Sequence, residues 1–192
     1  MDQRYTEGQK FSNDDFFKKV LPKGEYDGCV FASCNFSNAD ISNIVFIECK
    51  FSGCDMSMVK LFNTGFQKVS FQDCKMMGLR FEDCNNFGLE VSFERCVLSH
   101  SSFYQTRLKG TTFMDSKLEE ADFTESDLSA ASFENCDLHR ASFERTIIEN
   151  ADFRTARNYS IDPEYNRIKK AKFSQSGLHG LLEKYDIDID DI

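Results

Sequence analysis

The stretch AASFENCDLHRASF, residues 130–143, decides the fold. Its large apolar residues Phe133, Leu138 and Phe143 are five residues apart. A small residue stands two positions before each of them: Ala131, Cys136 and Ala141. A helix repeats every 3.6 residues and a strand every two, so neither accounts for a spacing of five. The stretch therefore indicates a repeating unit of five residues.

The same unit runs through most of the chain in two segments. The large apolar centres of the first segment are Phe31, Phe36, Ile41, Phe46, Phe51, Met56, Leu61, Phe66, Phe71, Met76 and Phe81. Those of the second are Phe93, Leu98, Phe103, Leu108, Phe113, Leu118, Phe123, Leu128, Phe133, Leu138, Phe143, Ile148 and Phe153. The two segments are out of step by two residues, which predicts a register slip within NNFGLE, residues 85–90.

A second period, of twenty residues, predicts the geometry. In the second segment every fourth centre is of the same kind, so that Phe occupies two opposite sides of a coil and Leu or Ile the other two. Four five-residue sides then make one coil, and stacked coils bond backbone to backbone about 4.8 Å apart. The pattern predicts an all-β solenoid whose axis is filled by ladders of apolar side chains.

The repeat, seen for example in ADFTE at 121–125 and SDLSA at 126–130, resembles the A(D/N)LXX pattern of the pentapeptide-repeat family over residues 29–155. The resemblance implies a right-handed quadrilateral β-helix. We divide the chain into an N-terminal cap (1–28), the β-helix (29–155) and a C-terminal cap and dimerisation segment (156–192).

The eight cysteines are predicted to be structural. All of them fall two positions before a repeat centre, or where that centre would be, in the slot that Ala and Ser occupy elsewhere. They are therefore expected to act as small buried apolar residues in a reducing compartment. Cys34, Cys54 and Cys74 would stack in one column, which makes a thiol cluster geometrically possible, although no His shares the slot.

The exposed edges of a β-helix need covering, and both ends of the chain offer candidates. SNDDFFKKVLPKGEY, residues 12–26, predicts a short capping helix that begins at Ser12 and stops at Pro22 and Gly24. At the other end four apolar residues share a helical face, and two isoleucines then alternate with Asp as in a strand: Leu178, Leu181, Leu182, Tyr185, Ile187 and Ile189. This segment is either an end cap or a cap that also forms a two-fold dimer interface.

The slip at 85–90 has two interpretations. In the first, it is a bulge in which Gly88 adopts a positive φ. In the second, it is a recognition loop that presents Asn86, Phe87, Gly88 and Glu90.

The charge points to a basic partner. The formal net charge of −9 and a pI of about 4.9 disfavour binding to nucleic acid or an anionic membrane. Acidic residues cluster as a candidate partner-binding face: Glu119, Glu120, Asp122, Glu125, Asp127, Glu134 and Asp137. Glu120 and Glu125 stand twenty residues before Arg140 and Arg145, so a solvated face with charges paired along the rod is the alternative.

The residues give no sign of catalysis. His100 and His139 lie outside the inward slots, and His179 lies in the terminal cap. No Gly-rich phosphate loop, HExxH or GxSxG motif is present, so we predict no enzyme activity, no cofactor and no metal. The polar start MDQRYTEGQK and the lack of a long apolar run favour a soluble cytoplasmic protein.

Two further resemblances concern function. CNNFGLEVSF, residues 84–93, is similar to a stretch of Qnr-type quinolone-resistance proteins. The segments 161–173 and 177–187 are similar to the C-terminal tail of the microcin immunity protein that protects DNA gyrase. These resemblances imply a homodimeric rod that mimics duplex DNA and binds a type II topoisomerase. Qnr-type proteins carry long loops that project from the coils, whereas here the repeats are interrupted only by the slip at 85–90. If those loops are what rescues a poisoned topoisomerase, this chain should bind weakly or inhibit without protecting. The alternative hypothesis is a structural or adaptor module whose flat sides bind another protein.

Overall fold

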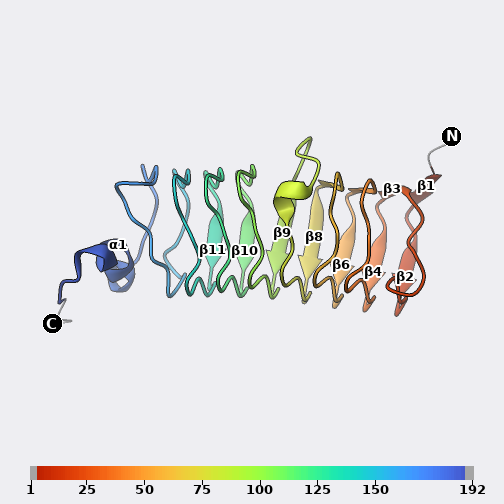
Figure 1. Cartoon of the computed structure of the whole chain (residues 1–192), viewed down its shortest axis with the longest axis horizontal. Helices are drawn as coiled ribbons and strands as arrows, with labels where there is room; N and C mark the ends of the chain where they lie inside the picture. Colours follow the sequence, from red (N-terminus) through yellow and green to blue (C-terminus); the bar gives the residue numbers. More distant parts are fainter. Residues whose placement is uncertain (1–3, 189–192) are drawn as a thin grey trace.

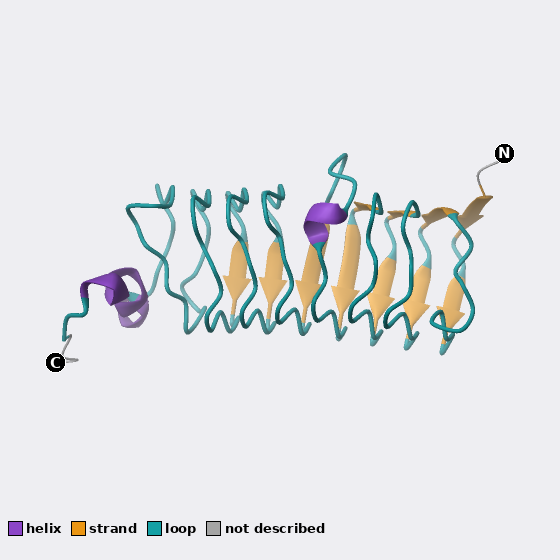
Figure 2. Ribbon diagram, in the orientation of Figure 1, coloured by secondary structure: helices purple, strands orange, loops and turns teal. Residues whose placement is uncertain are grey.

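The computed structural model describes residues 4–188, which form an elongated rod built of stacked coils (Figure 1). The strands are short and separated by tight turns (Figure 2). They are β1 (Arg4–Glu7), β2 (Lys10–Ser12), β3 (Gly24–Asp27), β4 (Val30–Ala32), β5 (Val45–Ile47), β6 (Lys50–Ser52), β7 (Gly65–Gln67), β8 (Val69–Gln72), β9 (Val91–Glu94), β10 (Thr112–Met114) and β11 (Ser132–Glu134).

Two parallel sheets form two sides of the rod. One has seven strands in the order β11-β10-β9-β8-β6-β4-β2, and the other has four in the order β1-β3-β5-β7. Equivalent residues in neighbouring strands are twenty apart, as for Phe31 and Phe51. The remaining sides are held by single parallel bridges, such as that between Asp122 and Ser142. The predicted all-β solenoid with its twenty-residue coil is therefore confirmed.

Stacked phenylalanine rings fill the axis of the rod. Phe123 lies between Phe103 and Phe143, with ring centroids 4.9 and 5.1 Å away, and its edge meets Phe113 on the opposite side at 5.9 Å. These rings are buried, as are the leucines that alternate with them around the coil. Each fully buried side chain of this kind stabilises the fold by about 1.5–3 kcal/mol.

The polar position of the repeat shapes the turns. In several repeats an Asp or Asn precedes the apolar centre, and its Oδ1 accepts a hydrogen bond from the backbone N–H two residues later. Asp122 accepts from Thr124 at 2.9 Å, and Asp127 accepts from Ser129 at 3.0 Å. Such Asx turns stabilise tight bends. The acidic character of the repeat is thus partly structural.

The expected capping helix at the N-terminus is wrong. The chain forms a further coil there, in which β1 pairs with β3 and β2 pairs with β4. Phe11 and Phe16 precede Phe31 and Phe36 by twenty residues, and their rings stack at 4.8 and 4.5 Å. Joining existing ladders buries more apolar surface than one short helix, which is marginal on its own.

The solenoid pairing also continues beyond Phe153 at the C-terminal end. Lys172 bridges to Asp152, and the ring of Phe173 stacks on Phe153 at 5.4 Å. The chain then forms three short helical turns: η2 (Gln175–Gly177), α1 (His179–Leu182) and η3 (Glu183–Tyr185). The predicted C-terminal helix is confirmed, as a single turn.

The predicted strand after this helix is not present in the described part. Ile187 lies in irregular backbone, because Asp186 turns the chain with a φ of +48°. Ile189 lies outside the described residues. None of the helical segments between residues 4 and 188 is long and apolar enough to cross a membrane.

Candidate protein-interaction surfaces

Most of the net negative charge lies in one section of the rod. Residues 110–139 contain eight acidic residues and one basic residue, a net of −7 within a chain of net charge −9. These residues, here called the acidic ring, are Asp115, Glu119, Glu120, Asp122, Glu125, Asp127, Glu134 and Asp137. All of them except Asp115 belong to the predicted partner-binding face. The Asp115 carboxylate accepts a hydrogen bond from Asn135 Nδ2 at 2.9 Å.

The acidic ring encircles the rod rather than forming one face. Glu134 lies in β11, on the side of the seven-stranded sheet. Asp137, Asp122 and Asp127 belong to three other ladders, because they bridge to residues 117, 102 and 107 respectively. The turns of a four-sided coil point successive pentapeptides in different directions. The structure therefore does not bring the seven predicted acidic residues together on a single face.

Three carboxylates of the ring, those of Glu120, Glu125 and Asp137, form ion pairs with arginines one coil further along the rod. Glu125 meets Arg145 at 2.6 Å, and its pKa is lowered by hydrogen bonds from Gln105 and Arg145. Glu120 lies 3.8 Å from Arg140. These two arginines stand one coil away, where the twenty-residue columns place them.

Asp137 combines a turn with an ion pair. Burial raises the pKa of its carboxyl. Hydrogen bonds from Asn158 and the backbone N–H of His139, together with Arg157 at 3.5 Å, have a larger opposite effect, so the pKa is lowered overall. Asp122 and Asp127 are half-buried and also accept turn hydrogen bonds. These aspartates therefore stabilise the turns of the coil in addition to carrying negative charge.

Glu119 and Glu134 are the carboxylates most open to a partner. Both are exposed. Within residues 4–188, neither side chain makes an ion pair or a hydrogen bond. A basic side chain of another protein would therefore meet no competing cation at these two positions.

The register slip produces a projecting loop. Val69 pairs with Val91 across the slip, an offset of twenty-two residues rather than twenty. The loop begins at η1 (Phe81–Asp83) and stands out from the rod between β8 and β9 (Figure 1). Gly88 has a φ of +70°, as expected for a bulge.

The loop anchors one apolar side chain and exposes another. Leu89 packs against the core, whereas Phe87 is 82% exposed. Asn85 Oδ1 accepts from the backbone N–H of Phe87 at 2.9 Å and so orders the turn. Asn86, Gly88 and Glu90 are also exposed. The loop thus combines a bulge with a displayed phenylalanine, and both interpretations of it stay open.

The C-terminal segment closes the end of the rod. Leu181 packs against the core, while Lys184 Nζ reaches Asp162 at 2.7 Å and Tyr185 donates to Glu164 at 3.1 Å. Leu182 is half-buried. Leu178 and Ile187 are 44% and 55% exposed. The segment is therefore an end cap that also displays apolar side chains.

The histidines and cysteines do not form a multidentate site. His100 lies against Glu120 at 3.2 Å on the surface, and His179 Nδ1 is 2.9 Å from the carbonyl oxygen of Ser176. All eight cysteines are buried and reduced. In the part of the chain from 4 to 188, no three metal-binding side chains converge on one point.

Parallel coils with four five-residue sides and a filled axis define the class of this protein as a repeat β-solenoid. The chain belongs to the pentapeptide-repeat family: the family model described as "Pentapeptide repeat region" matches residues 24–86 and 89–158. The break between the two matches falls in the projecting loop.

Solved structures support the same fold. A trypsin-treated variant of QnrB1, described as a plasmid-mediated fluoroquinolone resistance protein, is similar with a TM-score of 0.64 and 15% identity, covering 98% of this chain and 100% of that chain. Full-length QnrB1 is similar with a TM-score of 0.53 and 15% identity, covering 96% and 100%. At this identity the likeness shows the fold alone. No curated protein sequence matches the chain.

Proposed function

We propose that this protein is a non-enzymatic, cytoplasmic binding protein that mimics duplex DNA and occupies the DNA-binding surface of a type II topoisomerase such as DNA gyrase. Through this contact it would modulate sensitivity to quinolones or to toxins. The observation that carries the proposal is the acidic ring, which displays carboxylates on all sides of a narrow rod.

Duplex DNA also presents negative charge around its whole circumference. Proteins that bind it hold the phosphates with Lys and Arg, and these contacts supply much of the affinity. A rod that carries a ring of carboxylates can meet the same basic surface without any sequence-specific contact. The fluoroquinolone resistance attributed to QnrB1 is a property of that protein, and the shared fold makes gyrase the first topoisomerase to test.

A gyrase supercoiling assay tests the proposal. The purified protein would be titrated to micromolar concentration with and without a fluoroquinolone. We expect inhibition of supercoiling or protection from the drug, with an effect that weakens as salt is raised because exposed charges are screened. No change in supercoiling or in drug sensitivity would count against a topoisomerase partner.

Neutralising the open carboxylates should weaken the effect. We expect Glu119→Gln combined with Glu134→Gln to shift the titration to higher protein concentration, because both side chains are exposed and unpaired within residues 4–188. Glu7→Gln with Glu25→Gln removes the same charge from the N-terminal coil and serves as the matched control. Equal effects of the two variants would mean that net charge, and not the acidic ring, is recognised.

We also propose that the rod is a homodimer formed through its C-terminal cap. The exposed Leu178, Tyr185 and Ile187 lie together with the half-buried Leu181 and Leu182 in this segment. Replacing Leu181 and Leu182 by Asp should release monomers, as measured by light scattering during size exclusion. A dimer that survives this change would place the interface elsewhere.

A second candidate function is an adaptor that binds an unrelated protein. It is favoured by large apolar side chains that stand out from the rod, Phe62 at 67% exposure and Phe87 at 82%. This candidate predicts no effect on gyrase, and a partner in pull-downs that is lost with Phe87→Ala but kept with Glu119→Gln.

A further inference from the structure

A column of thiols runs along the inside of the rod. Its members come from four consecutive coils: Cys34, Cys54, Cys74 and Cys96. The backbone shows that they stack directly, because Lys75 N–H donates to the carbonyl oxygen of Cys54 at 2.9 Å and Val97 N–H to that of Cys74 at 3.0 Å. Cys96 joins this column only because the slip shifts the register by two residues.

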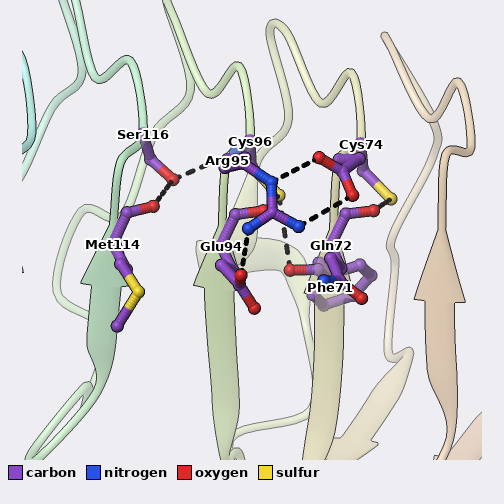
Figure 3. Close-up of polar contacts among 9 residues, drawn as sticks. Phe71, Gln72, Cys74, Glu94, Arg95, Cys96, Met114 and Ser116 are labelled. Carbon is purple, nitrogen blue, oxygen red and sulfur yellow. Dashed lines mark hydrogen bonds and ion pairs between the residues drawn. The ribbon is translucent and has the colours of Figure 1, made fainter.

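The thiols of the column lie one coil apart, and each donates to a backbone carbonyl oxygen: Cys54 to Phe31 at 3.3 Å, Cys74 to Gln72 at 3.3 Å and Cys96 to Phe71 at 3.4 Å. Figure 3 shows Cys74 and Cys96 on consecutive coils, with both side chains on the same side of the backbone. All four thiols are at most 1% exposed.

The spacing of the column suits one kind of ligand. Coils stack about 4.8 Å apart. A disulfide needs sulfur atoms about 2.05 Å apart and Cβ atoms about 3.8 Å apart, so it would compress the stack. Two metal–sulfur bonds of about 2.3 Å, the length found in zinc–thiolate sites, span about 4.6 Å when placed in line, which is close to the spacing of the stack.

We propose that adjacent thiols of the column bind soft metal ions that accept two sulfur ligands in line, with the mercuric ion as the best match. Soft thiolates select soft metals. Zinc is excluded from such a pair because it requires four ligands in a tetrahedron, and no three donors converge within the described residues.

Charge balance favours a divalent ion. Two thiols release two protons as Hg²⁺ forms two Hg–S bonds, and the product RS–Hg–SR is neutral. A monovalent ion held by two thiolates would leave a negative charge in the apolar core, where an unpaired charge is costly. The reaction involves no oxidation and needs no further reactant.

The chain contains a second pair of stacked thiols and two isolated thiols that serve as internal controls. Cys49 stacks on Cys29, since Lys50 N–H donates to the carbonyl oxygen of Cys29 at 2.9 Å. Cys136 is stacked on Ser116 in the same column, and Cys84 follows Thr64 at the slip, so neither has a thiol on the coil before it. Stacked thiols should therefore retain mercury where isolated ones do not.

A retention experiment tests the proposal. The reduced full-length protein would be loaded with mercuric chloride in two ways, by soaking and by refolding in its presence. Refolding ensures that slow diffusion of the metal into the buried column is not mistaken for the absence of a site. Excess glutathione would then strip singly bound metal before desalting and mass spectrometry. We expect three mercuric ions per chain, one on the Cys29 and Cys49 pair and two on the thiol column.

Substitutions assign the retained metal. Cys54→Ser with Cys96→Ser should lose two of the three ions, whereas Cys84→Ser with Cys136→Ser should lose none. Ser fits this slot because Ser116 already occupies it, and circular dichroism checks the fold. X-ray absorption should show two sulfur neighbours at about 2.3 Å. Loss of all mercury to glutathione by both loading routes, or equal retention by the two double variants, would overturn the proposal.

Discussion

Replacing Phe123 by Ala is expected to lower the free energy of unfolding by about 3 to 5 kcal/mol. The ring is fully buried at the middle of the rod and stacks between Phe103 and Phe143. Its edges also meet Phe113 and Phe133 at 5.9 and 5.7 Å. The substitution removes contacts with four rings, and the surrounding coils cannot collapse into the cavity because their spacing is held by backbone hydrogen bonds.

Urea unfolding followed by circular dichroism measures this effect. Phe87→Ala is the matched control, because it deletes the same ring from an exposed position of the loop and should change stability by less than about 0.5 kcal/mol. If both variants unfold at the same urea concentration as the unmodified protein, the stacked ring does not carry the stability assigned to it.

Replacing Gly180 by Ala is expected to displace the C-terminal cap from the end of the rod. A Cβ at this position would lie 2.2 Å from the carbonyl oxygen of Tyr159 and 2.8 Å from its ring. Tyr159 is held in turn by Phe153 and Phe173, with ring centroids 5.9 and 5.6 Å away. Overpacking of this kind costs about 1 to 3 kcal/mol. We expect a value at the upper end, because a backbone oxygen cannot move aside as a side chain can.

Hydrogen exchange of the amides in residues 175–185 reports on the cap. Gly180→Ala should speed this exchange while leaving that of β8 to β10 unchanged, since the coils do not depend on the cap for their own pairing. Glu183→Ala alters an exposed side chain of the same segment and should leave exchange as it is. Unchanged protection in Gly180→Ala would mean that the cap adjusts to the added methyl group. If the cap also forms the dimer interface, Gly180→Ala should weaken dimerisation as well.

The carboxylates of the acidic ring have two different roles in this chain. Asp122 and Asp127 carry turn hydrogen bonds, so replacing them would alter folding as well as charge. The side chains of Glu119 and Glu134 make no hydrogen bond or ion pair within the described residues, so replacing them changes the charge without removing a structural contact. Mutagenesis that aims at a partner should therefore begin with these glutamates.

The sequence by itself determined the coil, the columns and the core. A five-residue unit repeated at a period of twenty points every large apolar side chain inward when four units close one coil, so the sequence alone assigns Phe123 to its ladder. The turn residues agree with this arrangement, because Asp and Asn stand where the bends require them. Local and global preferences therefore point to the same fold.

Only the tertiary structure decided the ends, the distribution of charge and the full extent of the thiol column. Phe11 and Phe16 could begin a helix or join a ladder, and the choice depends on neighbours that are twenty residues away. The acidic residues are close in sequence, but the corners of the coil turn them to different sides. Cys96 joins its column through a two-residue offset. In each case the outcome depends on which coil lies beside which, and stacking between coils is a long-range interaction that a local repeat does not contain.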